Sequence, residues 1–260
     1  MMSVTNSFEF ISLANRLADA SGAAIRPYFR RPVAIDTKAD ASPVTVADRE
    51  AEHAIRSILS SVRPEDGIIG EEFGSENIDA ENVWIIDPID GTKSFITGRP
   101  IFGTLIALTK NETPILGVID QPITGERWIG LRGEGVSLNG EAVRTRRCST
   151  LAHATIATTD PSLFGEEEIG KWILVAERAR HVVYGGDCYN YAQIAVGLVD
   201  AVIESGLQPY DFAALPPVIE EAGGIVTDWR GNPLTLSSDG TVIACGDLEV
   251  HTELLDLLAG

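Results

Sequence analysis

Acidic residues follow three stretches of this 260-residue chain at points where strands or turns are expected to end. Asp87 and Asp90 follow the apolar run VWII, Glu71 and Glu72 follow GIIG, and Asp211 follows QPY. Taken singly, each has a structural interpretation: a β-turn at Asp87 to Asp90, a solvated turn at the glutamates, and an N-cap at Asp211. Taken together they are typical of a cation site, because ligand sites form at the carboxyl ends of strands.

The residue types favour magnesium. Hard divalent cations prefer carboxylate and carbonyl oxygens, and no cluster of His or Cys suggests zinc. Asp90 could bridge two ions roughly 3.5 to 4 Å apart, the usual spacing of a two-metal phosphoryl site. Gly91 and Thr92, at the expected start of a helix, offer backbone N–H groups to phosphate oxygens. The combination predicts a two-metal site that binds a phosphoryl group.

The composition limits the partners of the chain. Its formal net charge is −18 and it has no Lys/Arg stripe, so nucleic acid is not an expected partner. No apolar run reaches the roughly 18 residues of a membrane span, and the N-terminus lacks a signal or transit pattern, so we expect no membrane association and a cytoplasmic location. Cys148, Cys188 and Cys245 are scattered, which indicates free thiols rather than disulfides or a zinc site.

Periodicity and turn residues predict the elements that must position the acids. The first part of the chain indicates a helix over 7–31, a polar and mobile loop over 32–43, and a second helix from near Ser42-Pro43 to Val62. Asn139-Gly140 predicts a tight hairpin. Strands are expected over 83–87, 101–109, 114–122 and 126–132.

Beyond residue 146, strand-like and helix-like stretches alternate, which is the pattern of a layered α/β region. We therefore expect two lobes, with most acidic ligands in residues 1–146, and with Asp211 and the substrate-selecting residues in 147–260. Pro216-Pro217 interrupt a helical pattern, which predicts a kink or a late helix start.

Three segments in this order resemble the signature segments of the inositol monophosphatase family. They are GEEFG at 70–74, DPIDGTKSF at 87–95 and PYDFAALPPVIEEAGG at 209–224. The resemblance extends from about Lys38 almost to the C-terminus. It implies an α/β fold of alternating α-β-α-β-α layers and a phosphomonoesterase that depends on two or three Mg²⁺ ions, for which Mn²⁺ can substitute. It also implies a homodimer, sensitivity to lithium and a small-molecule phosphate monoester as substrate.

The resemblance assigns metal-binding roles to five residues. It implies that Glu71, Asp87 and the backbone carbonyl of Ile89 hold the first ion. Asp87, Asp90 and Asp211 then hold the second, which makes Asp90 both a ligand and part of the catalytic machinery.

The resemblance also implies how phosphate and water are held. Thr92, together with Glu71, would orient the attacking water, while the Gly91 and Thr92 amides bind the phosphate. Three accessory residues lie near these in the family pattern: Lys38, Asp48 and Glu72.

The second lobe is expected to select the substrate. Its Gly186-Asp187 pair is similar to the branch that hydrolyses L-histidinol phosphate, and Tyr210 stands where the inositol-specific branch has Trp. Histidinol phosphate carries an ammonium and a basic imidazole, for which Asp187 and Glu204 supply carboxylates, with Gly186 and Asp90 beside them. The structural alternatives are an N-cap at Asp187 and a strand-end charge at Glu204.

Other functions stay open at this point. The chain is alternatively an inositol-1-monophosphatase or a broad monophosphatase. A bisphosphate or nucleotide substrate would need a basic cluster, and the compact candidates, Arg144, Arg146 and Arg147, are more simply a solvated linker. A non-catalytic regulatory protein that binds metal and phosphate is a further alternative, although the presence of Glu71 and Thr92 favours catalysis.

Overall fold

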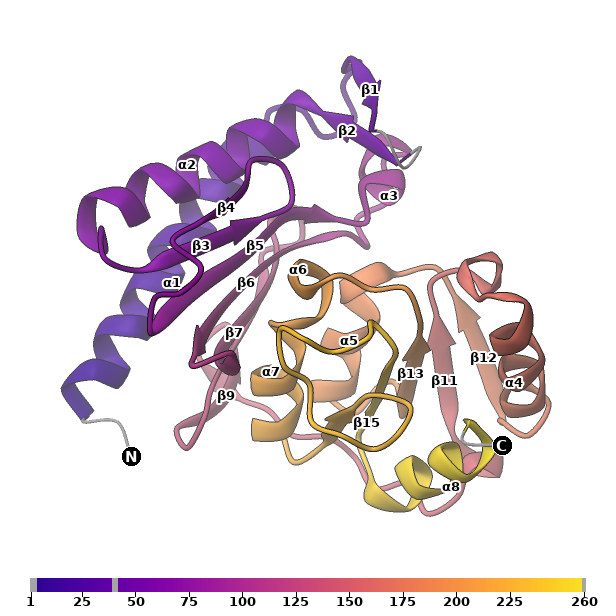
Figure 1. The fold of residues 1–260 in the computed structure, drawn as a ribbon. Helices are drawn as coiled ribbons and strands as arrows, with labels where there is room; N and C mark the ends of the chain where they lie inside the picture. The colour runs from indigo at the N-terminus through magenta and orange to yellow at the C-terminus, as the bar shows by residue number, and fades with distance from the viewer. Residues whose placement is uncertain (1–3, 39–41, 259–260) are drawn as a thin grey trace.

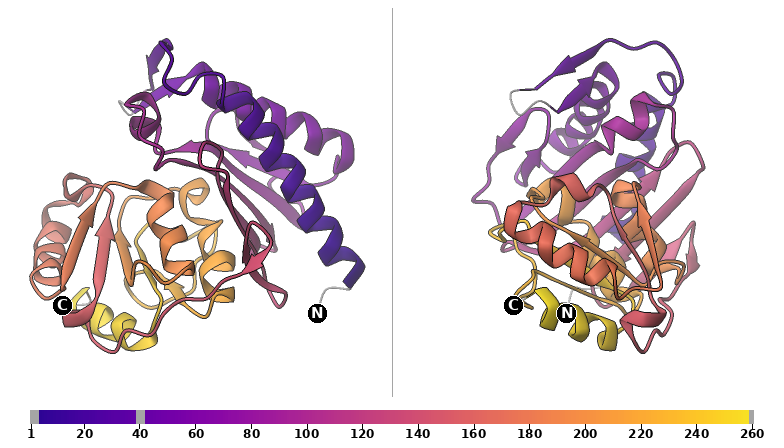
Figure 2. Two further views of the ribbon diagram at one scale, coloured as in Figure 1. Left: turned by 180° about the vertical axis from the view of Figure 1, so that it is seen from behind. Right: turned by 90° about the vertical axis from the view of Figure 1, so that its right-hand side faces the viewer.

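Helices and sheets alternate in the computed structural model, which describes residues 4–38 and 42–258 (Figure 1). The order is α-β-α-β-α, which confirms the fold class expected from the sequence. Two helices cover the outer face of a large sheet, two lie between this sheet and a smaller one, and two cover the far face of the smaller sheet (Figures 1 and 2). In that order the helices are α1 (Val4–Ile25), α2 (Val46–Val62), α5 (Asp187–Ala195), α7 (Leu215–Glu221), α4 (Glu166–Ala176) and α8 (Leu248–Leu258).

The large sheet is formed by residues of the first half of the chain. Within the described residues its strand order is β10-β9-β8-β7-β6-β5-β3-β4, and its neighbours are antiparallel except for β3 and β5. The strands are β3 (Gly67–Gly70), β4 (Gly74–Glu76), β5 (Asn82–Asp90), β6 (Gly103–Lys110), β7 (Thr113–Gln121), β8 (Glu126–Leu131), β9 (Gly135–Leu138) and β10 (Glu141–Ala142).

The smaller sheet comes from the second half. Its order among the described residues is β12-β11-β13-β15-β14, with parallel pairs at β11 and antiparallel pairs at β15. The strands are β11 (Thr155–Thr158), β12 (His181–Tyr184), β13 (Ala201–Glu204), β14 (Ile225–Thr227) and β15 (Val242–Cys245).

Strand β5 shows how one sequence run is buried on both faces of a sheet. Trp84 and Ile86 pack with α1 and α2, while Val83 and Ile85 pack with α5, α7 and part of the smaller sheet. Alternate side chains of a strand point to opposite faces, so a continuous apolar run is what a central strand between helical layers requires. The strand therefore fixes the layer order and ends at the acidic residues.

Two strand glycines let a helical segment approach the large sheet closely. A Cβ on Gly117 of β7 would lie 2.0 Å from the Ala214 carbonyl oxygen, and one on Gly130 of β8 would lie 2.2 Å from that of Pro217. Glycine inside a strand is typical of such backbone approach. The segment that is seated there begins with α6 (Pro209–Phe212), which carries Asp211.

The first two helices differ from the sequence prediction at one end each. Helix α1 ends at Ile25 rather than at residue 31, because Arg26 precedes Pro27 and that position disfavours helical backbone. Helix α2 begins at Val46, not near Ser42-Pro43, because Thr45 caps it and Pro43 belongs to a strand.

The segment expected as a mobile loop over 32–43 contains strand structure. Strand β1 (Ile35–Thr37) pairs antiparallel with β2 (Pro43–Thr45). Residues 39–41 lie outside the described residues, and the mobility of this segment stays a prediction.

Other sequence predictions are confirmed. Leu138 pairs with Glu141 across Asn139 and Gly140, both at positive φ, as the predicted hairpin requires. The prolines at 216 and 217 lie in the first turn of α7, where missing N–H groups cost least, so the helix starts late. The boundary near residue 146 stays a prediction, and one core cluster joins residues of both sheets.

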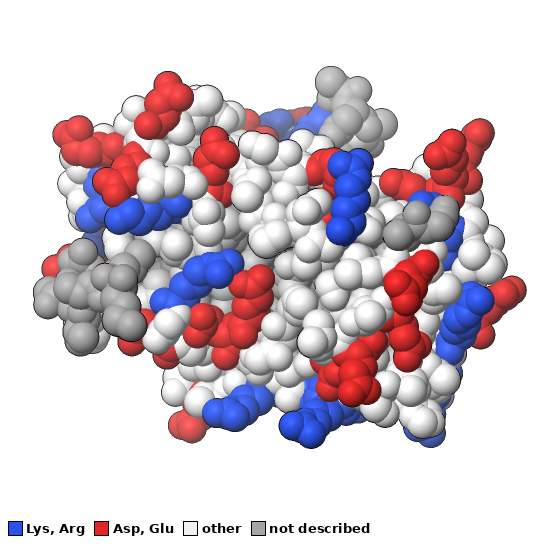
Figure 3. Space-filling view, turned by 60° about the horizontal axis from the view of Figure 1, so that its bottom comes forward, with Lys and Arg blue, Asp and Glu red and all other residues white. Residues whose placement is uncertain are grey.

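The surface agrees with the absence of a basic stripe in the sequence. Lys and Arg side chains alternate with Asp and Glu over the described part of the face in Figure 3. Among the described residues, no helix combines the length and the apolar character that a bilayer crossing needs.

We predict that Gly117→Ala destabilises the protein strongly, because the new Cβ would collide with the Ala214 carbonyl at 2.0 Å. The expected loss is about 1–3 kcal/mol or more of unfolding free energy, measured by urea denaturation. Gly170→Ala is the control: nothing lies within 4 Å of its added Cβ, so this substitution within α4 should stabilise by roughly 0.5–1 kcal/mol. Equal stabilities would contradict the close-approach explanation.

Candidate metal and phosphate site

The end of β5 brings Asp87 and Asp90 to the same side of the strand. Two residues three apart on a regular strand point to opposite faces. Here Asp87 pairs with Leu105 and Asp90 with Gly103, so β5 has one residue more than β6 over this span, which is a β-bulge. The sequence alternative of a simple β-turn is wrong, because strand pairing continues to Asp90.

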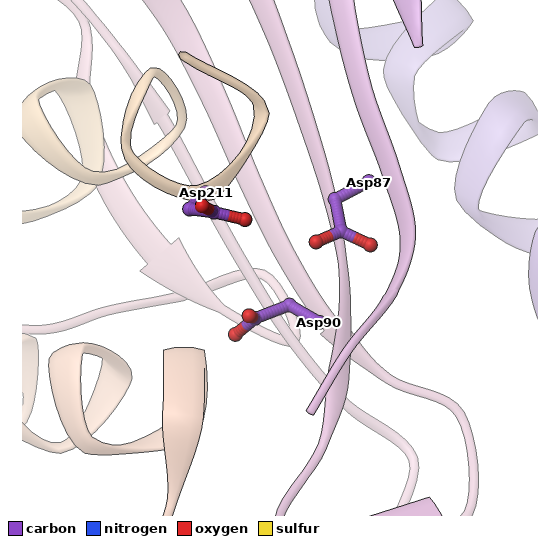
Figure 4. A group of neighbouring side chains, drawn as sticks. All are labelled: Asp87, Asp90 and Asp211. Carbon is purple, nitrogen blue, oxygen red and sulfur yellow. The ribbon is translucent and has the colours of Figure 1, made fainter. Parts of the chain in front are cut away.

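Asp211 completes the group from the far half of the chain. One carboxylate oxygen from each of Asp87, Asp90 and Asp211 lies within 4.8 Å of the others, and the three side chains point toward a common space (Figure 4). Asp211 occupies the third position of α6, where its Oδ2 accepts the Gln208 amide at 2.7 Å. It is therefore not the N-cap that the sequence suggested as an alternative; Gln208 has that position.

Burial and neighbouring carboxylates raise the pKa of these three acids. Burial is the largest cause for each, and Asp211 adds to the rise at Asp87 and at Asp90. At Asp211 the Gln208 amide opposes the rise while Glu71 and Glu204 add to it, and the result is a pKa of about 7. Asp87 and Asp90 have pKa values well above the ordinary range for the same reasons. One buried and two half-buried acids this close repel one another when ionised, and a multivalent cation between them would relieve that repulsion.

Glu71 lies beside this group, in the turn between β3 and β4. Its carboxylate raises the pKa of Asp87, after burial. Its Oε1 accepts Lys38 Nζ at 2.7 Å, whereas its Oε2 is buried and has no hydrogen-bond partner among the described residues. A buried carboxylate oxygen without a partner is costly, so Glu71 fits a cation at this position. The donor set is entirely oxygen, as hard divalent cations prefer.

Lys38 joins the hairpin that contains β1 and β2 to the site. Its Nζ contacts Glu71 at 2.7 Å and Glu72 at 2.6 Å. Burial alone would lower the Lys38 pKa, but hydrogen bonds to the two glutamates raise it overall. Burial raises the pKa of Glu72 to about 7, and Glu71 adds to this while Lys38 opposes it. The Glu72 side chain is 4% exposed, so the solvated turn considered for it is wrong.

Gly91 and Thr92 form the start of α3 (Thr92–Ile96), as predicted. Gly91 is the N-cap with φ of 90°, in the left-handed region that glycine adopts without strain, and no side chain caps this end. The Thr92 hydroxyl lies 3.1 Å from the Ile89 carbonyl and 3.3 Å from Asp48 Oδ1, and its single proton serves one of them at a time. The opposite oxygen of Asp48 accepts the Thr45 amide at 2.9 Å, so Asp48 links the α2 cap to the site.

Two adjoining cavities open beside the acids and share Asp187. One of about 150 Å³ is lined by Asp90, Asp211 and Glu204, and the other of about 290 Å³ by Glu71, Gly91 and Thr92. Arg144, Arg146 and Arg147 line a different cavity, so the cationic cluster considered for a second phosphate lies apart from the acids.

Asp187 is held at the wall between the two cavities. Gly186 is the N-cap of α5 and Asp187 its first helical residue, which corrects the alternative that Asp187 is the cap. Its φ of 44° is uncommon outside glycine, and its Oδ2 accepts the Ser94 hydroxyl at 3.0 Å. Burial raises the Asp187 pKa, while Ser94, Lys93 and Arg99 oppose that rise.

Glu204, by contrast, is already engaged within the protein. Its Oε1 accepts the Thr159 amide and its Oε2 accepts the Tyr191 hydroxyl, both at 2.8 Å. Each oxygen keeps one lone pair for a ligand, so the Glu204 carboxylate can still accept a hydrogen bond from a substrate.

Sequence reasoning missed four residues at these cavities. Lys93 and Ser94 lie in the quoted segment DPIDGTKSF and Arg99 follows it by four residues, so position within or just after that motif is the signal that would have found them. Tyr191 follows Asp187 by one helical turn, and that spacing is its signal.

Comparison with known proteins agrees with this geometry. Residues 7–259 match the model of the inositol monophosphatase family. The bifunctional phosphatase IMPL2, chloroplastic, of Arabidopsis thaliana is 49% identical over 99% of this chain and 77% of that protein. A histidinol-phosphatase of Chlorobaculum parvum is 36% identical over 90% of this chain and 91% of that protein. The solved structure of an inositol monophosphatase from Zymomonas mobilis has a TM-score of 0.90 and 48% identity, with 100% of both chains covered.

We predict that Asp211→Asn stabilises the protein when a chelator removes metal. The folded-state pKa of about 7 lies above the ordinary 3.8, so the folded state binds more protons and loses stability as the pH rises from about 4 to about 7. At pH 7.5 the neutral amide removes this loss, and the thermal midpoint should rise by roughly 2–4 °C for each 1 kcal/mol relieved.

Excess Mg²⁺ or Mn²⁺ should reverse the order, because metal that binds only the folded state stabilises wild type more than the variant. The control is Asp228→Asn, which changes a buried carboxylate that accepts three hydrogen bonds from Arg230 and Asn232 and should lose stability in both conditions. A lower midpoint for Asp211→Asn in chelator would contradict the repulsion described above.

Proposed function

The chain belongs to the inositol monophosphatase family and is a phosphatase, and from that premise we propose that it hydrolyses L-histidinol phosphate to L-histidinol and phosphate with Mg²⁺ as cofactor. The observation that carries the choice of substrate is Asp187, a half-buried carboxylate in the wall between the two cavities. Relatives whose name is histidinol-phosphatase, at 36% identity, support it.

The proposed metal ligands are the oxygens gathered at the end of β5. Glu71, Asp87 and the Ile89 carbonyl would hold one ion, and Asp87, Asp90 and Asp211 another. Magnesium supplies Lewis-acid chemistry when bound, because it lowers the pKa of water and stabilises charge on a leaving oxygen. Mg²⁺ rather than zinc follows from the all-oxygen donor set.

The chain's own groups would position phosphate and water. The Gly91 and Thr92 amides at the start of α3 donate to phosphate oxygens, which is favoured at an uncapped helix end next to a glycine. Thr92 and Glu71 both line the larger cavity, and the Thr92 hydroxyl and Glu71 Oε2 would orient the water for in-line attack. Positioning and charge neutralisation supply most of the rate in such reactions, so no covalent enzyme intermediate is needed.

The leaving group would occupy the cavity lined by Asp187 and Glu204. Asp187 would pair with the ammonium of histidinol, and the remaining lone pairs of Glu204 would accept from the imidazole or a hydroxyl. Ser94 donates to Asp187, and this hydrogen bond together with Lys93 and Arg99 favours the ionised carboxylate that a cationic substrate needs.

Inositol-1-phosphate is the second candidate substrate. The hydroxyl groups of Ser94 and Tyr191 near the same cavities are suitable partners for a polyol, and the similar Zymomonas mobilis structure is of an inositol monophosphatase. Measured hydrolysis of any monoester would exclude the non-catalytic alternative, which requires metal and phosphate binding without turnover. The homodimer and the cytoplasmic location stay predictions, and light scattering after size-exclusion chromatography tests the first.

We predict that the purified protein with Mg²⁺ releases phosphate from histidinol phosphate with a higher kcat/KM than from inositol-1-phosphate. A panel of small monoesters measures this, and the opposite order would move the chain to the second candidate.

Asp90→Asn should lower kcat on every active substrate by on the order of 10³-fold or more, because Asp90 belongs to both the metal cluster and the substrate cavity. Near-normal turnover in that variant would contradict the two-metal proposal.

We further predict that Asp187→Asn raises KM for histidinol phosphate by about 10- to 100-fold, since a charged hydrogen bond is worth roughly 1.5–3 kcal/mol. KM for phenyl phosphate, which has no cation, should change by less than about threefold. Asn tolerates the positive φ at this position, so the backbone should be kept. The control is Asp160→Asn, which changes an exposed acid at the larger cavity and should leave the ratio of the two KM values unchanged. If Asp187→Asn affects both substrates equally, Asp187 has no role in recognising the cation.

A further inference from the structure

A glutamate of α2 is buried against the turn that carries Glu71. Glu52 is 0% exposed, and its carboxylate faces the GEEFG turn at 70–74 rather than solvent. Neither the metal cluster nor the two cavities includes it. A buried carboxylate is costly unless it is paired and hydrogen-bonded, so its contacts identify what it does.

The Glu52 carboxylate binds the backbone of the turn directly. Its Oε2 accepts the Glu72 amide at 2.7 Å, and its Oε1 accepts the Phe73 amide at 3.2 Å. Arg56, one helical turn later, donates its Nε to the same Oε1 at 2.7 Å. The two amides that follow Glu71 are therefore held by one charged side chain.

Arg56 extends the network across the turn. Its Nη1 donates to Glu76 at 2.9 Å, and its Nη2 donates to the Gly74 carbonyl. Together, Glu52 and Arg56 fix both the start and the end of the turn between β3 and β4 to the rigid helix α2.

Gly70 is shaped to this contact. A Cβ at this position would lie 2.0 Å from Glu52 Oε1 and 2.5 Å from its carboxyl carbon. Any side chain at position 70 would collide with the Glu52 carboxylate. Gly70 is not at positive φ, so its backbone conformation does not by itself require glycine. The glycine that precedes Glu71 thus admits Glu52 to the turn.

We propose that Glu52 is a positioning residue: it holds the GEEFG turn so that Glu71 Oε2 faces the metal cluster. This inference rests on the proposed role of Glu71 as a metal ligand. Glu71 itself is anchored by its own amide, which donates to the Ile86 carbonyl at 3.1 Å, and by Lys38. Lys38 also contacts the Glu72 side chain, but it is Glu52 that binds the backbone amides of residues 72 and 73. Removal of a group that orients a metal ligand typically lowers metal affinity by about 10- to 100-fold.

Mn²⁺ titration followed by calorimetry tests the proposal, with folding checked by circular dichroism. Glu52→Gln keeps the size of the side chain but places an amide donor against backbone donors. It should weaken Mn²⁺ binding by about 10-fold or more, at the same site that Glu71→Gln weakens. In the double variant, Glu52→Gln should add less than about twofold to the loss caused by Glu71→Gln, because both act through the same ligand.

The matched control is Asp66→Asn, at the opposite end of β3. Asp66 is also a buried carboxylate in contact with an arginine, Arg63 at 2.8 Å, and with Trp84 Nε1 at 3.0 Å. Asp66→Asn should lose stability and keep wild-type Mn²⁺ affinity. If Glu52 had a purely structural role, Glu52→Gln would give that same result.

Three results would overturn the inference: wild-type Mn²⁺ affinity in Glu52→Gln, an equal loss of affinity in Asp66→Asn, or additive losses in the double variant. If Glu52→Gln does not fold, Glu52→Asp is measured instead; it keeps the charge but withdraws the oxygens by one methylene, and affinity equal to wild type would overturn the proposal. Absence of Mn²⁺ binding by wild type would instead refute the proposed function, and with it this inference.

Discussion

Mutual repulsion among closely spaced carboxylates is the constraint on which the rest of this structure depends. Asp87, Asp90 and Asp211 place oxygens within 4.8 Å of one another, although each would be more stable apart and hydrated. The fold must therefore hold them by other interactions. Backbone hydrogen bonds provide these: the bulge at the end of β5, the capping contact of Asp211 with Gln208, and the Asp87 carboxylate that accepts the Ile89 amide at 3.0 Å. Stability is given up locally where a cation is to bind, as is usual at functional sites.

The layered architecture brings parts of the chain to this point from three directions. Strand β5 supplies two acids from the large sheet, α6 supplies Asp211 from between the sheets, and the turn after β3 supplies Glu71 next to α2. Gly117 and Gly130 matter here because they let the segment after α6 rest on the sheet backbone itself. The hydrophobic cores on the two faces of β5 fix these directions, and the acids themselves contribute little to folding.

The leaving-group side is built differently from the metal side. Its cavity walls come mostly from α5, β13 and the segment after β11, whereas the phosphate side is lined by Gly91, α3 and Glu71 together with part of the segment after β11. Asp187 belongs to both sides. Helix α5 places it against Gly91, so that a Cβ added to Gly91 would lie 2.6 Å from an Asp187 carboxylate oxygen. A change of substrate therefore requires few changes at the metal cluster, which explains how one family can include relatives named for different phosphate esters.

The sequence alone determined the α/β class, the central apolar strands, the Asn139-Gly140 hairpin and the short segments in which the acids lie, because these depend on local periodicity and turn chemistry. Only the tertiary structure decided the rest. The bulge that turns Asp87 and Asp90 to one side, the seating of Asp211 beside them, and the contact of Glu52 with the turn after Gly70 all depend on partners 13 to 124 residues away in the chain. The ends of α1 and α2 were also missed, since local signals at Pro27 and Thr45 compete with an amphipathic pattern that continues past them. Long-range packing selects among local alternatives of similar free energy, and such a selection leaves no mark within a short window of sequence.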